Sequence, residues 1–246
     1  MPDLTGQVAF VTGGSRGIGA AIATRLAQDG ADVAFTYRAD KRSADETAGR
    51  IRAAGRTALA IQADSAEPHA ATESVDTVVR NLGRLDILVA NAGIFPNGPL
   101  DDVTLDEIDQ TLAIHVRAPL LAAQAAAAHM GDGGRLIAIG SCYAERVPVP
   151  GVTLYSMTKS ALTGLVKGLA RDLGPRGITA NVVHPGPTDT DMNPADGPDA
   201  EAERALTALG RYGTGADVAG MVAFLASQEG AWVTGASFAV DGGYAA

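Results

Sequence analysis

Apolar residues fall along the chain in short runs, separated by longer stretches that carry a helical repeat. Several of the runs are apolar on successive positions, which is typical of parallel strands buried on both faces. The runs predict strands at Val8–Thr12, Asp32–Tyr37, Thr57–Gln62, Ile87–Ala90, Arg135–Ile139, Thr179–Val183 and Ser237–Val240. The stretches between them predict helices at Gly17–Gln28, Ser43–Ala54, Pro68–Asn81, Leu105–Met130, Leu154–Leu173 and Ala216–Ser227.

Strand and helix alternate along the whole chain, with no composition break or internal repeat. Such an alternation implies a parallel sheet with right-handed crossovers. The sequence therefore predicts one α/β domain over residues 1–246. The expected architecture is a single-domain Rossmann fold, in which a seven-stranded doubly wound parallel sheet carries helices on both faces.

The segment Asp189–Arg211 breaks this alternation. It is rich in Pro, Asp and Gly at its start and turns helical only at Ala200–Leu209. Long connections are uncommon in compact α/β domains and often form lids or binding loops. We expect this segment to cover the binding site, and Ile94–Pro99 and Cys142–Val149 to shape the substrate pocket with it.

The composition, with 46% hydrophobic and 19% charged residues, is that of an ordinary globular protein. A net charge of −9 opposes binding to duplex nucleic acid, although local cations and helix N-termini can still hold an anionic cofactor. The single cysteine, Cys142, excludes an intrachain disulfide, and with no base beside it we interpret it as structural. Neither a signal peptide nor a membrane span is recognisable, so a cytoplasmic protein without membrane contact is expected. No metal site is predicted.

A glycine-rich turn, Thr12–Gly19, follows the first predicted strand and leads directly into a helix. This context aims backbone N–H groups and the positive end of the helix dipole at a pyrophosphate. Gly13 can supply the turn, Gly17 the close approach of a ligand and Gly19 the close packing of helix on strand. The alternative is a plain strand-to-helix loop, but the position of the glycine turn directly after the first strand favours dinucleotide binding.

The end of the second strand indicates which dinucleotide is preferred. A site for NAD(H) would place an acidic residue there to hold the ribose hydroxyls. Instead the strand ends at Tyr37 and Arg38, Lys41 and Arg42 follow, and Arg16 lies inside the glycine turn. Arginine fits a 2′-phosphate, so NADP(H) is favoured over NAD(H). Lys41 and Arg42 fit a solvated charge run well, so Arg16 and Arg38 are the better candidates for contact with the 2′-phosphate.

Tyr155 and Lys159 are four residues apart near the start of a predicted helix, and therefore share one face. An ammonium beside a phenol favours the phenolate, so we expect Lys159 to lower the pKa of Tyr155 toward a value useful for acid/base chemistry. Ser141 ends a strand, where a hydroxyl could bind a substrate oxygen. Taken singly, each feature has an alternative interpretation: Tyr155 and Lys159 could form a surface contact on a helix, and Ser141 could be a turn serine.

Together these motifs resemble the short-chain dehydrogenase/reductase family, over nearly the whole chain. The landmarks in family order are the Thr12–Gly19 turn, Asp64, Asn91-Ala92-Gly93, Ser141, Tyr155, Lys159, Pro185-Gly186, Thr190 and Asp241-Gly242-Gly243. The resemblance implies that Tyr155 is the acid/base, Lys159 its electrostatic support and Ser141 the substrate anchor. The implied cofactor contacts are Gly13, Ser15, Arg16, Gly17, Ile18, Gly19, Tyr37, Arg38, Asp64, Ser65, Asn91, Ala92, Gly93, Tyr155, Lys159, Pro185, Gly186, Thr188 and Thr190.

His115 departs from the family pattern, because it stands where an Asn usually completes a proton relay. In the family, the backbone carbonyl at this point is thought to hold a relay water, which a histidine could preserve. The imidazole could also titrate near neutrality and join the relay as a fourth catalytic residue. The alternative is a helix histidine with a local hydrogen bond and no chemistry.

Two functions of different class follow from the resemblance. The first is an NADP(H)-dependent oxidoreductase that acts on a small carbonyl or alcohol. The second is a nucleotide-binding sensing or sequestering protein on the same fold, because the chain looks like a cyclic-di-GMP-binding subgroup in its Phe35–Tyr37 strand end and Asp191–Pro198 segment. The Ser141, Tyr155 and Lys159 set favours the enzyme. The family also implies self-association as a dimer or tetramer (homotetramer), through the helices matching Leu105–Met130 and Leu154–Leu173.

Overall fold

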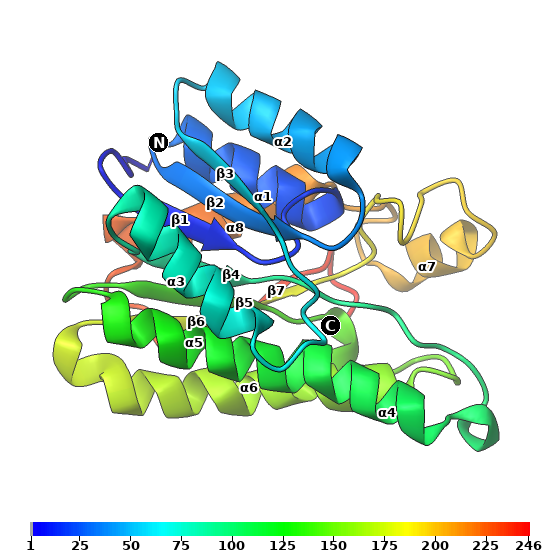
Figure 1. Ribbon diagram of the computed structural model, residues 1–246. Helices are drawn as coiled ribbons and strands as arrows, with labels where there is room; N and C mark the ends of the chain where they lie inside the picture. Colours follow the sequence, from blue (N-terminus) through cyan, green and yellow to red (C-terminus); the bar gives the residue numbers. More distant parts are fainter. Residues whose placement is uncertain (1) are drawn as a thin grey trace.

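A computed structural model describes residues 2–246 and contains one parallel sheet (Figure 1). The strands are β1 (Val8–Val11), β2 (Asp32–Tyr37), β3 (Ala58–Gln62), β4 (Ile87–Ala90), β5 (Arg135–Ile139), β6 (Thr179–Pro185) and β7 (Ser237–Val240). Their order is β3-β2-β1-β4-β5-β6-β7, and every neighbouring pair is parallel. The predicted seven-stranded doubly wound sheet is confirmed.

Two layers of helices cover the sheet, one on each face (Figure 1). On one face, α1 (Gly17–Gln28), α2 (Lys41–Ala53) and α8 (Gly215–Ala226) bury their apolar residues against the sheet. On the other face lie α3 (Ala70–Leu82), α5 (Ala118–His129) and α6 (Thr153–Leu173). Because both faces are buried, the strands are apolar on successive positions, as the sequence pattern indicated.

Strand order reverses between β1 and β4, since the chain winds outward first through β2 and β3 and then through β5 to β7. In open α/β sheets, ligands bind at this switch point, outside the carboxyl ends of the strands. The turn after β1 and the segments after β4, β5 and β6 all emerge at that edge.

Several helix ends differ from the sequence prediction. Helix α2 begins at Lys41 rather than Ser43, because the Asp40 side chain accepts the Ser43 N–H at 3.0 Å and caps the helix there. Helix α3 begins at Ala70, two residues after the predicted Pro68. Short 3₁₀ turns occupy Leu100–Asp102, Cys142–Ala144, Gly174–Arg176 and Gln228–Gly230.

The predicted single helix Leu105–Met130 is wrong, because a π-helical turn divides it. Helix α4 (Leu105–Leu112) and α5 flank a π segment, Ala113–Arg117, that contains His115. Pro119, in the first turn of α5, has no N–H to offer the His115 carbonyl four residues earlier, so the α-helical ladder cannot run through this point. Such π turns are frequent at functional sites.

The segment Asp189–Arg211 runs along the same edge of the sheet and contains one short helix, α7 (Ala200–Leu206), which projects from the body of the molecule in Figure 1. Its helical part is three residues shorter than predicted. Among residues 2–246, no helix is both long and apolar enough to cross a membrane. The same residues contain no group of three or more His, Cys, Asp and Glu side chains that could hold a metal ion.

Candidate active site

The glycine turn after β1 is held by hydrogen bonds from the neighbouring strand ends. Thr36 of β2 accepts the Gly13 N–H with its hydroxyl at 2.8 Å and the Gly14 N–H with its carbonyl at 2.9 Å. The Asn91 side chain, just after β4, donates to the carbonyls of Thr12 and Gly13 at 2.9 and 3.1 Å. The turn is therefore rigid before any ligand arrives, and Thr36 is a contributor that the sequence motif did not reveal.

Two of the glycines are required by space and backbone conformation. A Cβ on Gly19 would lie 2.3 Å from the Gly13 carbonyl oxygen and 2.5 Å from the Asn91 amide nitrogen, far inside contact distance. Gly17 adopts a φ of +54°, and a Cβ there would press on the Thr190 side chain at 3.3 Å. The turn thus packs against both the helix and the segment after β6, which leaves its backbone accessible from the cavity.

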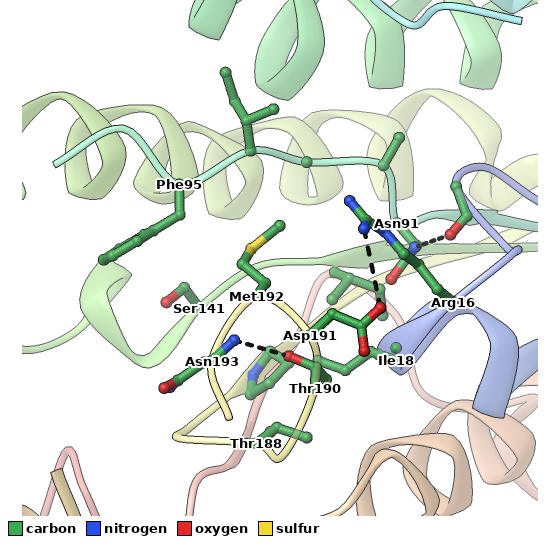
Figure 2. Close-up of a pocket in the computed structure, with 18 of the residues that line it drawn as sticks. Arg16, Ile18, Asn91, Phe95, Ser141, Thr188, Thr190, Asp191, Met192 and Asn193 are labelled. Atoms are coloured by element: carbon green, nitrogen blue, oxygen red, sulfur yellow. Dashed lines mark hydrogen bonds and ion pairs between the residues drawn. The ribbon is translucent and has the colours of Figure 1, made fainter. Parts of the chain in front are cut away.

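Two arginines border the cavity beside the glycine turn. Arg16 is exposed and precedes α1, whose first turn carries no acidic residue. Arg38 is exposed at the end of β2. The Arg16 guanidinium lies 3.9 Å from the carboxylate of Asp191, and Figure 2 shows it reaching toward that residue across the cavity. Both cations are accessible to an anionic ligand.

Lys41 and Arg42 lie outside this group. They pair along α2 with Asp45 at 2.8 Å and with Glu46 at 3.1 Å, both at i,i+4 spacing. Their solvent-facing ion pairs fit the interpretation of a solvated charge run.

A cavity of about 670 Å³ extends from the glycine turn to the ends of β5 and β6. It is lined by every predicted cofactor contact, namely Gly13, Ser15, Arg16, Gly17, Ile18, Gly19, Tyr37, Arg38, Asp64, Ser65, Asn91, Ala92, Gly93, Tyr155, Lys159, Pro185, Gly186, Thr188 and Thr190. Ser141 lines it too, whereas His115 lies behind the wall. The volume is that of a site for a large organic ligand.

Tyr155 and Lys159 lie one turn apart on α6, with the Lys159 ammonium 5.8 Å from the centre of the Tyr155 ring. The ammonium donates to the carbonyl oxygen of Ile139 at 2.9 Å. Burial lowers the pKa of Lys159 to about 8. Burial also raises the pKa of Tyr155 to about 12, an effect that the Ser141 hydroxyl only partly offsets.

The expected lowering of the Tyr155 pKa by Lys159 is therefore wrong, because burial raises this pKa. Removal of the phenolate from water raises the pKa of Tyr155 more than the Lys159 ammonium lowers it. The ammonium is itself desolvated, and it already donates to the Ile139 carbonyl. Tyr155 holds its proton firmly at neutral pH.

Ser141 follows β5 and has its backbone and side chain fixed separately. Its N–H donates to Nδ1 of His184 at 3.1 Å, and its hydroxyl oxygen accepts the Tyr143 N–H at 3.2 Å. The hydroxyl hydrogen is then available to a substrate oxygen in the cavity. His184 was not identified from the sequence.

His115 is buried, and both ring nitrogens are engaged. Nε2 accepts the Ile94 N–H at 3.0 Å, so in the neutral ring the proton lies on Nδ1 and faces the Thr158 hydroxyl at 2.9 Å. Burial, with Lys159 nearby, lowers the pKa of His115 to about 3. Both contacts oppose titration of this imidazole near neutrality, because a second proton on Nε2 would break the bond from the Ile94 N–H.

The far end of the cavity is aromatic. Phe95 meets Tyr155 edge to face at a centroid distance of 4.8 Å, and Tyr143 lies 6.3 Å from Phe95 in a stacked arrangement and 5.9 Å from Tyr244. Met192 projects from the Asp189–Arg211 segment into the same space (Figure 2). Sequence reasoning named the segments of Phe95 and Tyr143 but missed Tyr244, whose only signal was an aromatic residue after Asp241-Gly242-Gly243.

Cys142, next to Ser141, is buried, and burial raises the pKa of its thiol to about 12. It remains a thiol at neutral pH and cannot act as a nucleophile in that state. The structural interpretation of this residue agrees with its surroundings.

Comparison with known proteins identifies the family. Residues 13–245 match the family described as Enoyl-(Acyl carrier protein) reductase. The Cyclic-di-GMP-binding biofilm dispersal mediator protein of Escherichia coli (strain K12) is 47% identical over 246 residues, all of both chains.

Two solved structures superpose closely on the chain. A blue fluorescent protein from a metagenomic library, in complex with NADPH, is 60% identical with a TM-score of 0.97, and the match covers 99% of this chain and 100% of that one. A short chain dehydrogenase from Burkholderia cenocepacia J2315, in complex with NADP, is 58% identical with a TM-score of 0.97 over 99% of both chains. The chain belongs to the short-chain dehydrogenase/reductase family of oxidoreductases.

Proposed function

We propose that the protein is an NADP(H)-dependent oxidoreductase that reduces a carbonyl to an alcohol. One observation carries the proposal: Ser141, Tyr155 and Lys159 converge at one end of the cavity whose other end is the glycine turn. That geometry places a proton donor and a hydroxyl anchor beside the reactive end of a bound dinucleotide. NADP(H) is preferred over NAD(H) because Arg16 and Arg38 border the cavity, and because the relatives described above hold NADPH or NADP.

The chemistry divides between the cofactor and three side chains. Bound NADPH supplies the hydride that adds to the carbonyl carbon. The Ser141 hydroxyl donates to the carbonyl oxygen and orients it, and Tyr155 transfers its phenolic proton to that oxygen as negative charge develops there. Lys159 contributes positive charge at the same place and still has N–H donors for the ribose hydroxyls.

The raised pKa of Tyr155 suits the role of general acid in a reduction. A phenol with a pKa of about 12 keeps its proton until a strong base, the incipient alkoxide, forms beside it. Oxidation of an alcohol would need the phenolate first, which this buried site disfavours at neutral pH.

We further propose that His115 contributes its backbone rather than its imidazole to proton supply. Its carbonyl has lost the α-helical partner at Pro119, and it belongs to the π turn behind Tyr155, where a relay water would bind. The imidazole holds that turn in place through Ile94 and Thr158.

The substrate that best suits the pocket is an uncharged aromatic carbonyl compound. The chain has only 4% aromatic residues, yet Phe95, Tyr143, Tyr155 and Tyr244 gather at the reactive end. Rings arranged edge to face and offset offer contacts that a flat substrate can join. The Asp189–Arg211 segment adds the carboxylates of Asp199 and Glu203 to the lining, which disfavours anionic substrates. We expect this segment to act as a lid.

A second candidate function is the binding of a cyclic dinucleotide, which the name of the Escherichia coli relative attributes to that protein. The glycine turn and its two arginines would serve such an anion as well as a nicotinamide dinucleotide. Calorimetric titration with cyclic-di-GMP, with and without saturating NADPH, tests it. Binding that NADPH abolishes would support a shared site, and no heat at millimolar ligand would exclude this function.

We also propose self-association, as a dimer or tetramer in the cytoplasm. Leu105, Leu112 and Leu120 are exposed along α4 and α5, and Trp232, before β7, is 98% exposed. Large apolar side chains in that number suggest surfaces that a second copy covers. Light scattering after size-exclusion chromatography would report the number of copies, and a monomer at micromolar concentration would contradict this expectation.

The proposed activity is tested by NADPH oxidation, followed at its absorbance, over aldehydes, aryl ketones, diketones, quinones and 3-oxoacyl thioesters. Tyr155→Phe should reduce turnover of the best substrate by at least about 100-fold, the lower end of the range for general acid catalysis, because only the transferable proton is lost. Binding of NADPH, measured by fluorescence titration, should stay within about twofold. Turnover that survives the substitution would refute the mechanism.

A further inference from the structure

A second fully buried histidine, His184, contacts the active site from the side opposite His115. It lies on β6, has no exposed surface, and points toward α6. Its Nδ1 accepts the backbone N–H of Ser141 at 3.1 Å. In the neutral ring the proton therefore lies on Nε2, which faces the Thr163 hydroxyl of α6 at 3.5 Å and the Glu145 carboxylate at 3.8 Å.

The Ser141 N–H depends on this imidazole. Pairing between β5 and β4 ends at Ala138, and pairing between β5 and β6 ends at Ile139. The Gly140 N–H still donates to the Val183 carbonyl of β6 at 2.7 Å, whereas the N–H of the next residue, the buried Ser141, donates to the His184 ring. A buried N–H without an acceptor is costly, and His184 supplies the acceptor that the strand ladder does not.

The preceding residue shows how closely the ring is fitted. A Cβ on Gly140 would lie 2.3 Å from Nδ1 of His184 and 2.6 Å from its Cε1. Only glycine lets the imidazole lie directly against the backbone that leads into Ser141. The contact fixes the path of the chain where β5 gives way to the loop of residues 141–149.

The rest of that loop is attached to the same helix. Ser156 of α6 donates to the Tyr143 carbonyl at 2.9 Å, and Ser160 donates to the Ala144 carbonyl at 3.2 Å. His115 makes the matching arrangement on the other side, where it accepts a loop N–H and bonds a threonine of α6. The helix that carries Tyr155 is thus linked to both loops that frame the substrate.

From this geometry we propose that His184 is a positioning residue: its imidazole holds the Ser141 backbone against α6 and so sets the Ser141 hydroxyl relative to the Tyr155 phenol. This role rests on the proposed function, because it acts on the substrate anchor of that reaction. It is separate from the binding of the dinucleotide's pyrophosphate, which the glycine turn performs at the other end of the cavity.

The role requires the neutral imidazole, because a protonated ring cannot accept the Ser141 N–H. Burial lowers the pKa of His184, and Lys159 on α6 acts in the same direction. Glu145 and Asp241, which lies beyond β7, oppose this effect. The net result keeps Nδ1 available as an acceptor.

Two substitutions separate positioning from simple packing. His184→Leu fills a comparable volume without an acceptor, and His184→Asn can return an amide oxygen near the place of Nδ1. We expect His184→Leu to lower kcat by about 10- to 100-fold, the cost of an anchor displaced by about 1 Å. His184→Asn should recover most of that loss. Neither should change the dissociation constant of NADPH by more than about twofold, and the exposed His129→Asn serves as the matched control.

A double-mutant cycle with Ser141→Ala gives the decisive comparison. If His184 acts through the Ser141 hydroxyl, His184→Leu should cost little further kcat once that hydroxyl is gone. An equal loss of kcat in both backgrounds would overturn the proposal. So would an unchanged kcat accompanied only by a lower melting temperature. Absence of NADPH-dependent turnover in the unmodified protein, or full turnover in Ser141→Ala, would instead refute the proposed function and this role with it.

Discussion

Replacement of the buried His115 by asparagine should make the protein markedly less sensitive to acid. The imidazole has 1% of its surface exposed, and its two nitrogens are bonded to Ile94 and Thr158. Its pKa of about 3 lies well below the 6.5 of an unstructured histidine. Between these values the unfolded chain binds a proton that the folded chain refuses, so unfolding takes up a proton and stability falls as the pH falls.

The magnitude follows from the difference between the two pKa values. Each pH unit between 6.5 and 3 removes about 1.4 kcal/mol from the free energy of unfolding. A change from pH 7 to pH 4.5 therefore costs about 3 kcal/mol through this one residue. Since single domains are stable by only about 5–15 kcal/mol, the loss is large enough to dominate the acid limb of the stability curve.

The assay is urea unfolding of wild type and His115→Asn at pH 7 and pH 4.5, at one fixed protein concentration. Asparagine does not titrate, so the difference between the two pH values should be smaller by about 3 kcal/mol in the variant. The exposed His129→Asn should show the wild-type difference. Parallel pH dependences of wild type and His115→Asn would mean that the folded protein accepts the proton, which would refute the assignment of His115 as a neutral hydrogen-bond partner.

Three other outcomes follow from the same structure. The pH–rate profile of His115→Asn above pH 6 should match that of wild type, because the imidazole is already neutral there. An altered profile would mean that the His115 imidazole takes part in the proton relay. The value of kcat/KM should fall as the pH rises through about 8, where Lys159 loses its charge, and stopped-flow measurement from pH 6 to 10 would detect a profile without that limb. Fluorescence titration should show tighter binding of NADPH than of NADH. Substitution of Arg16 and Arg38 by alanine should weaken NADPH binding by about tenfold or more and leave NADH binding unchanged. Equal losses of affinity for both cofactors would contradict selection of the 2′-phosphate.

Sequence alone was sufficient for the architecture because the strands are buried on both faces. A strand such as Val8–Val11, fully buried along its length, cannot be confused with a half-exposed antiparallel strand. The glycine turn could be placed for a similar reason, since Gly19 is fixed by contacts that only glycine satisfies. Where only one residue type fits the local backbone and its contacts, the identity of that residue indicates the local geometry.

The division of Leu105–Met130 was harder to predict, although its cause is visible in the sequence. Pro119 can begin a helix as well as interrupt one, and the apolar alanines on either side continue the helical repeat. Tertiary packing, of α4, the π turn and α5 with α6, decides whether the helix is continuous or interrupted at this point. The same limit applies to His184, because β6 gives no local sign that its side chain will reach the end of β5.

The pKa values of the site residues depend on burial and on distances that the spacing of residues in the sequence does not encode. These pKa values change the interpretation of the site. Desolvation acts on four groups at once: it keeps Tyr155 protonated, holds His115 and His184 neutral, and brings Lys159 to a pKa of about 8. At neutral pH the only charged member of this set is therefore the Lys159 ammonium. Burial accounts for the shift in the Lys159 pKa, so no carboxylate of the described residues neutralises this charge before negative charge develops on the substrate oxygen. Its attraction is then stronger in the transition state than in the ground state, which is the condition for catalysis. In the proposed mechanism, Lys159 therefore contributes less by lowering the pKa of the resting Tyr155 than by stabilising the oxyanion to which Tyr155 would give its proton.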